Sequence, residues 1–266
     1  MLQVNNINYR ISASLSLTNI SFSAEAGEVV VILGANGAGK STLLQIVTGA
    51  LKADSGSIVI NDKPHAAWSA ADRAVFCAVL QQQNQLQLPF TVHEVVMMGR
   101  YPHFKRQASL NDEQIVGAVL EQTGIQHLKD RNYLTLSGGE QQRVHLARVL
   151  AQIADTDTGT VRYLYMDEPS NNLDIKHQHA ALDLARSFAR QGNCVVAVLH
   201  DLNLALQYAD KILLLKHGQL QGFGVPADIM TDDSISQVYG MPLQLFHHPS
   251  CQHPIVMPAR YNIVNN

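Results

Sequence analysis

The segment GANGAGKS at residues 34–41 places glycines, a lysine and a serine at the spacing G-x-x-x-x-G-K-[ST]. It follows the apolar run EVVVILG and precedes STLLQIVTGAL, whose apolar residues recur at helical spacing. A glycine-rich turn between a strand and a helix can surround phosphate groups with backbone N–H groups, and a lysine adds positive charge. The predicted phosphate-binding residues are Gly34, Ala35, Asn36, Gly37, Ala38, Gly39, Lys40, Ser41 and Thr42.

Two carboxylates end the apolar run VRYLYMDEP, which we predict to be a strand. Parallel sheets bind ligands at the carboxyl ends of their strands. We therefore predict that Asp167 and the Ser41 hydroxyl are ligands of Mg²⁺, and that Glu168 orients or deprotonates the attacking water. His200 ends the next predicted strand, CVVAVLH, so we expect it at the same sheet edge.

A third polar strand end follows the predicted strand AVFCAVL, where three successive glutamines occur. The amide of Gln82 could bridge Mg²⁺ and the attacking water, which would make this residue both a metal ligand and part of the catalytic group. The chemistry of the glutamines alone leaves open which of the three performs this role.

The segment LSGGEQQR at residues 136–143 contains neither a general base nor a metal-binding spacing. Its serine is a good N-cap for the helix predicted to follow, and the first N–H groups of a helix are free to bind an anion. We predict that Ser137, Gly138 and Gly139 bind a phosphate group of the same nucleotide.

The positions of these motifs require a particular class of fold. Apolar strands alternate with helical segments, which indicates a parallel sheet with helices on both faces. Residues 1–33 are predicted to form strands, and residues 91–157 are predicted to be mainly helical. The helical stretch interrupts the alternation, so we expect an inserted subdomain. The C-terminal tail, from residue 243, contains two short strand-like runs around a turn.

Length and composition fit one large or two small globular domains. The chain has 266 residues, of which 46% are hydrophobic and 15% are charged. Its formal net charge of −3 gives no basic field, so we expect no nucleic-acid partner. The three cysteines are predicted to be buried, reduced thiols. Because no leader and no apolar run of spanning length is found, we expect a partner to hold the chain at any membrane.

The motifs in this order resemble those of ABC-type ATPases over essentially the whole chain. GANGAGKS resembles the Walker A motif, LSGGE the family signature and YLYMDE the Walker B motif. The resemblance implies an α/β P-loop NTPase fold with a RecA-like core, an N-terminal antiparallel β subdomain and an inserted helical subdomain. Residues 1–266 would form one ATP-binding domain, with 1–85 and 158–266 in the core and β subdomain and 86–157 in the helical subdomain.

The same resemblance implies roles for individual residues. His200 matches the switch histidine, Gln82 matches the Q-loop glutamine, and Asp174 in NNLD matches the D-loop aspartate. Two subunits would stack head to tail, so that Ser137 and its neighbouring glycines close over ATP bound to the other subunit. The family usually stacks an aromatic residue on adenine; here the matching position is Ile11, and a tyrosine, Tyr9, lies two residues earlier.

Three segments resemble importers of metal chelates, and most of all the ATP-binding subunits of haem importers. They are LPFTVHEVVMMGRYPH, DTDTGTVRYLYMDEP and VYGMPLQLFHHPSCQHPIVMP. This implies ATP and Mg²⁺ as cofactors, two copies of this chain with two permease subunits, a periplasmic haem-binding protein, and a place on the cytoplasmic face of the inner membrane. A ferric siderophore or vitamin B12 is the alternative cargo.

Two other protein classes share some of these motifs, and the tail contains residue types that bind metals. An ABC ATPase acting on ribosomes or DNA would share the motifs but usually has two ATPase halves or long inserted arms, and a P-loop kinase has no reason to carry LSGGE. The tail residues His247, His248, Cys251 and His253 could in principle bind haem or a metal, but their spacing is not a standard zinc pattern.

Overall fold

The computed structural model describes residues 1–81, 86–104, 106–154, 159–169 and 173–259. Five apolar runs form the parallel part of the sheet, in the order β9, β3, β8, β7, β6. Their bounds are Lys211–Lys216, Val29–Leu33, Cys194–Val198, Tyr163–Asp167 and Cys77–Leu80. Because these strands are parallel, all five end at the same edge of the sheet, where predicted site residues follow β3, β7 and β8.

The N-terminal strands extend this sheet with antiparallel pairs. They are β1 (Leu2–Arg10), β2 (Ser16–Ala24), β4 (Ser55–Ile60) and β5 (Lys63–Pro64). Strand β10 (Gln219–Gly224) pairs with β9 antiparallel and with β2 parallel. The two parts are therefore joined in one ten-stranded sheet. Strand β10 was not predicted, because its glycines and polar residues obscure the apolar alternation of a strand.

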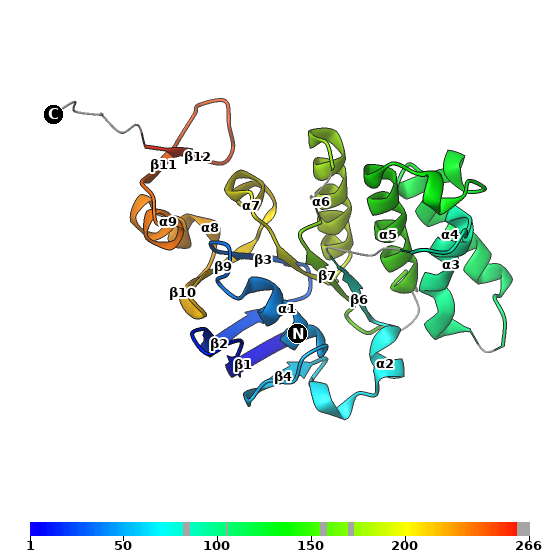
Figure 1. The fold of residues 1–266 in the computed structure, drawn as a ribbon, viewed down its shortest axis with the longest axis horizontal. Helices are drawn as coiled ribbons and strands as arrows, with labels where there is room; N and C mark the ends of the chain where they lie inside the picture. The colour runs from blue at the N-terminus through cyan, green and yellow to red at the C-terminus, as the bar shows by residue number, and fades with distance from the viewer. Residues whose placement is uncertain (82–85, 105, 155–158, 170–172, 260–266) are drawn as a thin grey trace.

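Helices cover the sheet and form a separate group beyond β6. Those near the sheet are α1 (Lys40–Thr48), α2 (Ala70–Ala74), α6 (Ile175–Arg190) and α7 (Leu202–Tyr208). The separate group contains α3 (Val92–Met97), α4 (Leu110–Gln122) and α5 (Gly138–Gln152). Short 3₁₀ helices span His65–Ala67, Met98–His103, Gln126–Leu128 and Tyr133–Thr135. Figure 1 shows the α3–α5 group at one end of the molecule.

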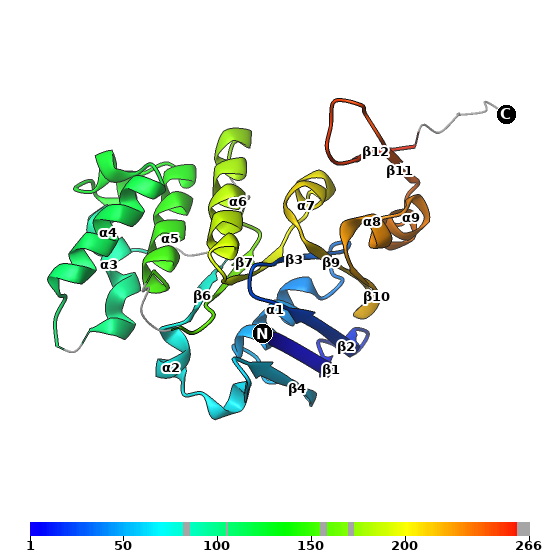
Figure 2. The same ribbon diagram turned by 180° about the vertical axis from the view of Figure 1, so that it is seen from behind.

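The opposite end of the molecule is formed by the C-terminal elements (Figure 2). Helices α8 (Pro226–Ile229) and α9 (Asp232–Tyr239) precede a hairpin of β11 (Leu243–Phe246) and β12 (Ile255–Pro258). The hairpin corresponds to the two strand-like runs predicted for the tail. The two helices were not predicted, although Thr231 begins α9 with a capping box that the sequence contains.

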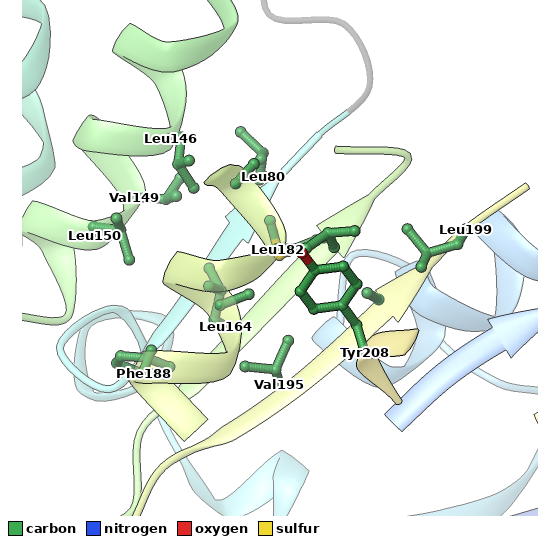
Figure 3. Packing of buried hydrophobic residues seen from close by; sticks show 14 of the residues in the cluster. Leu80, Leu146, Val149, Leu150, Leu164, Leu182, Phe188, Val195, Leu199 and Tyr208 are labelled. Carbon is green, nitrogen blue, oxygen red and sulfur yellow. The ribbon is translucent and has the colours of Figure 1, made fainter. Parts of the chain in front are cut away.

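The core lies on both faces of the parallel strands, because alternate side chains of a strand point to opposite faces. In β3, Val30 and Ile32 pack with α1 and the N-terminal strands, whereas Val29, Val31 and Leu33 pack on the other side. Figure 3 shows that second side, where leucines and valines of α5 face the sheet and α6. Its labelled residues are Leu80, Leu146, Val149, Leu150, Leu164, Leu182, Phe188, Val195, Leu199 and Tyr208.

Two local predictions were wrong. The strand expected from residue 74 begins at Cys77, because Ser69 and Asp72 form a capping box that starts α2, and this helix ends at Ala74. The thiols are free, but only that of Cys194 is fully buried; Cys77 is half-buried and Cys251 is exposed.

Within the described part of the chain, no helix is both long and apolar enough to cross a bilayer.

Candidate nucleotide-binding site

The path of the loop between β3 and α1 requires glycine. At Gly34 a Cβ atom would lie 2.2 Å from the backbone oxygen of Leu215. At Gly39 the backbone has φ +100°, and a Cβ atom would lie 2.9 Å from the Leu17 side chain. Both close approaches and the left-handed conformation exclude other residues, so the glycines allow the loop to turn tightly into the N-terminus of α1.

The Lys40 ammonium group lies inside this loop. Lys40 is buried, and its Nζ donates hydrogen bonds to the carbonyl oxygens of Gly34 at 2.8 Å and Ala35 at 3.1 Å. Burial lowers the lysine pKa, and the negative charges of Glu168 and Asp167 oppose that change. The loop therefore holds a positive charge beside the two carboxylates.

Ser41 and Asp167 meet across the base of the site. The Ser41 hydroxyl donates to Oδ1 of Asp167 at 3.1 Å, although the residues are far apart in the sequence. Burial raises the pKa of Asp167, and the Ser41 hydrogen bond opposes this rise. Two oxygen ligands side by side fit Mg²⁺, which takes few protein ligands and leaves its other positions to water and phosphate.

Glu168 and His200 follow the neighbouring strands β7 and β8 and contact each other. The backbone N–H of Glu168 donates to the Val198 carbonyl at 3.1 Å, and Nε2 of His200 contacts Oε1 of Glu168. Glu168 has φ +53°, in the left-handed region that a glutamate rarely adopts. Such strain is typical of functional positions. The pair can hold and move a proton at the edge of the site.

A cavity of about 510 Å³ opens beside these residues. The residues that line it are Ile11, Leu15, Asn36, Gly37, Ala38, Gly39, Lys40, Ser41, Thr42, Glu168 and His200. Of the two candidates for adenine contact, Ile11 therefore faces the cavity, whereas Tyr9 is not among the lining residues. Leu15 was not predicted; a turn in which the Ile11 N–H donates to the Leu15 carbonyl at 3.0 Å brings it there.

The signature segment is folded for anion binding but lies outside this cavity. Ser137 is the N-cap of α5, and both its hydroxyl and its N–H donate to Glu140 Oε2 at 2.8 Å. The hydrogen bond from the Ser137 backbone lowers the pKa of Glu140. Neither Ser137 nor Gly138 nor Gly139 lines the cavity at Lys40. One chain therefore does not bring its own signature segment to its own phosphate loop.

Asp174 is the N-cap of α6, the helix that follows Asp167 and Glu168 along the chain. Its Oδ1 accepts hydrogen bonds from the backbone N–H of His177 at 2.9 Å and contacts Nδ1 of the same residue at 2.6 Å. The backbone hydrogen bond lowers the pKa of Asp174. Gln82, which was predicted to bridge Mg²⁺ and water, lies outside the described residues.

The tail residues do not form a metal centre. His247, His248, Cys251 and His253 are described, and no group of three or more histidine, cysteine, aspartate or glutamate side chains in the described ranges could hold a metal ion. The N–H of Cys251 donates to the His248 carbonyl at 2.9 Å, which closes a turn between the hairpin strands. These residues therefore lie in the connection between the two hairpin strands.

Known proteins match the chain over nearly its whole length. Hemin import ATP-binding protein HmuV of Gloeobacter violaceus is 45% identical over 97% of this chain and 94% of its own. The protein of the same name from Pseudomonas fluorescens is 42% identical over 97% and 99%. An inward-facing metal-chelate type ABC transporter has a similar fold, with a TM-score of 0.82, 24% identity and 98% of both chains covered.

A further solved structure shows a related cassette after hydrolysis. It is a dimeric ATP-binding cassette with ADP and Pi bound; its TM-score is 0.73 at 25% identity, over 85% of this chain and 98% of that one. The ABC transporter family pattern matches residues 17–171, which is more than half of the chain. With the phosphate loop, the paired carboxylates and the signature helix in place, the chain belongs to the ABC transporter family, as a subunit that binds and hydrolyses ATP.

Proposed function

We propose that this chain powers the import of haem across the bacterial inner membrane. The observation that carries the proposal is its similarity, over nearly the full length, to several proteins named hemin import ATP-binding protein. Two copies of the chain would work with two permease subunits, and a periplasmic haem-binding protein would deliver the cargo. The chain would lie on the cytoplasmic face of the membrane, held there by the permease.

Within one subunit, the residues of the cavity have separate tasks. The backbone from Gly34 to Thr42 binds the phosphates, and the Lys40 ammonium attracts the outer ones. Ser41, Asp167 and Gln82 would hold Mg²⁺, which would neutralise charge on the phosphates. Glu168 accepts a proton from the attacking water, while His200 contacts the γ-phosphate and orients Glu168.

The signature segment acts on the second subunit. Because Ser137, Gly138 and Gly139 lie outside the cavity of their own chain, we propose that they contact an ATP molecule bound by the other copy. The free N–H groups at the start of α5 stabilise its γ-phosphate as an electrostatic clamp. Asp174, at the start of α6, lies at the same interface and supports the closed dimer.

The permease would dock near the α3–α5 group. We propose that residues 86–157 form the helical subdomain and that a groove near residues 82–101 receives a helix of the permease. Leu88 and Tyr101 support this placement, since each has 59% of its surface exposed although both are large and hydrophobic. Large exposed apolar patches mark partner surfaces, and we propose that these two side chains contribute to one.

The decisive experiment is uptake by a strain that lacks the gene for this chain. We expect haem uptake to be lost and to return with the wild-type gene, whereas Glu168→Gln does not restore it. Uptake of ferric siderophore and of vitamin B12 is measured in the same strain as a control. Normal haem uptake with failure on a siderophore or B12 would reassign the cargo and leave the ATPase mechanism unchanged.

A further inference from the structure

We name the C-terminal segment 226–258 the strap. Side-chain hydrogen bonds within it join α9 to the hairpin. Asp232, at the start of α9, accepts a hydrogen bond from the Leu245 N–H at 2.7 Å. The Ser236 hydroxyl bonds the backbone of Leu243, accepting from its N–H at 2.8 Å and donating to its carbonyl at 3.1 Å. Helix α9 and the hairpin β11–β12 therefore form one unit.

The hairpin also binds α7. Asn203 accepts a hydrogen bond from the Val256 N–H at 2.8 Å, and its amide donates to the Val256 carbonyl at 3.5 Å. The backbone N–H of Asn203 in turn donates to Oδ1 of Asp201 at 2.7 Å. Because Asp201 directly follows His200, a short chain of hydrogen bonds connects the hairpin to the residue beside the histidine.

Helix α9 of the strap also packs against β9. Tyr239 is the last residue of α9, and its hydroxyl is buried. Burial raises the pKa of Tyr239 to about 12; the Gly34 backbone opposes the rise and the Asp201 carboxylate adds to it. The buried hydroxyl of Tyr239 therefore anchors the end of α9 in the protein interior.

Helix α7 needs such support because it contains only the seven residues Leu202–Tyr208. Helices much shorter than about 12 residues are marginal alone, so contacts from outside determine where they lie. Hydrolysis can fail with the rest of the site in place if His200 is displaced from Glu168. A shift of α7 would therefore move His200 relative to Glu168.

We propose that Asn203 is a positioning residue, through which the strap fixes His200 against Glu168 and so sets the rate of ATP hydrolysis. The inference rests on the roles proposed above for Glu168 and His200. In the absence of the Asn203–Val256 bonds, α7 and His200 sample more positions, while the phosphate loop still binds ATP. The consequence is a lower kcat at an unchanged KM for ATP.

The test compares Asn203→Leu, which removes both side-chain bonds, with Asn203→Asp, which keeps the acceptor for the Val256 N–H. Gln244→Ala, on the exposed side of the hairpin, is the matched control. We expect Asn203→Leu to lower kcat about 3- to 10-fold, the effect of about one hydrogen bond, with KM unchanged. Asn203→Asp and Gln244→Ala should hydrolyse ATP at nearly the normal rate.

A double-mutant cycle distinguishes positioning of His200 from general loss of structure. In a His200→Ala background, Asn203→Leu should cause no further fall in kcat, because the group it positions is gone. An equal fall in both backgrounds, or a rise in KM without a change in kcat, would overturn the inference. A normal rate in His200→Ala alone would instead remove the proposed role of the histidine, and the inference with it.

Discussion

Nε2 of His200 contacts the carboxylate of Glu168, and this contact joins the ends of the neighbouring strands β8 and β7. The strands bring the two residues together because they are parallel and end at the same edge of the sheet. The contact orients the Glu168 carboxylate in the cavity that Lys40 and Ser41 also line.

Replacement of Lys40 by alanine should weaken ATP binding more than any other single change in the loop. The variant removes the buried ammonium group, whose charge-assisted hydrogen bonds to phosphate are worth about 1.5–3 kcal/mol, or about 10- to 150-fold in Kd. Binding of a fluorescent ATP analogue measures the change. Lys52→Ala, at an exposed position, is the control; equal affinity of wild type and Lys40→Ala would contradict the assignment.

Glu168→Gln should slow hydrolysis but preserve ATP affinity. The amide keeps the size and one acceptor of the carboxylate, yet it cannot take a proton from water, so kcat should fall by a general-base factor of about 10²–10⁴. Phosphate release at saturating ATP measures the rate. Glu121→Gln, at an exposed position, is the control. A normal rate of hydrolysis in Glu168→Gln would show that Glu168 is not the general base.

Ser137→Arg should prevent closure of the ATP-bound dimer. In a Glu168→Gln background, ATP and Mg²⁺ should trap a closed dimer, and a bulky arginine at the start of α5 would block the partner's γ-phosphate. Size-exclusion chromatography, or crosslinking within the full transporter, reports closure. Ser69→Arg removes a serine from a similar capping box of α2 and should still close; equal closure with Ser137→Arg would refute the clamp.

His200→Ala should lower the rate of ATP hydrolysis without weakening ATP binding, whereas Lys40→Ala should weaken ATP binding itself. The phosphate loop stays intact, so ATP affinity should be preserved, while loss of a transition-state contact lowers kcat by about 10²–10³. Binding and phosphate release are measured on the same preparation. His127→Ala, at an exposed position, serves as the control; equal loss of ATP binding in His200→Ala and Lys40→Ala would show that the histidine is misassigned.

The histidines of the tail should be dispensable for transport. Replacing His247, His248 and His253 together by glutamine should leave haem uptake unchanged, because these residues form no described metal centre. Uptake is measured in the deletion strain that carries the variant, with protein amount checked by immunoblot. Loss of uptake at a normal protein amount and melting temperature would give the tail a role in cargo handling.

Local sequence patterns were sufficient for much of the fold and for the order of the motifs. The apolar runs around Val31, Leu164 and Val196 are buried strands, since a sheet covered on both faces takes near-continuous apolar runs. Ser137 at the start of α5 was predicted because capping chemistry acts within a few residues. The spacing of the glycines likewise encodes the turn at Gly34 and Gly39.

Only the tertiary structure determined contacts between residues far apart in the chain. The Ser41–Asp167 hydrogen bond depends on strand order, as does the contact of Glu168 with His200. Strand β10 escaped prediction because pairing with β9 and β2, not its own composition, makes it a strand. Local propensity determines which segments become helices and strands, whereas burial and pairing with distant partners determine where their side chains meet.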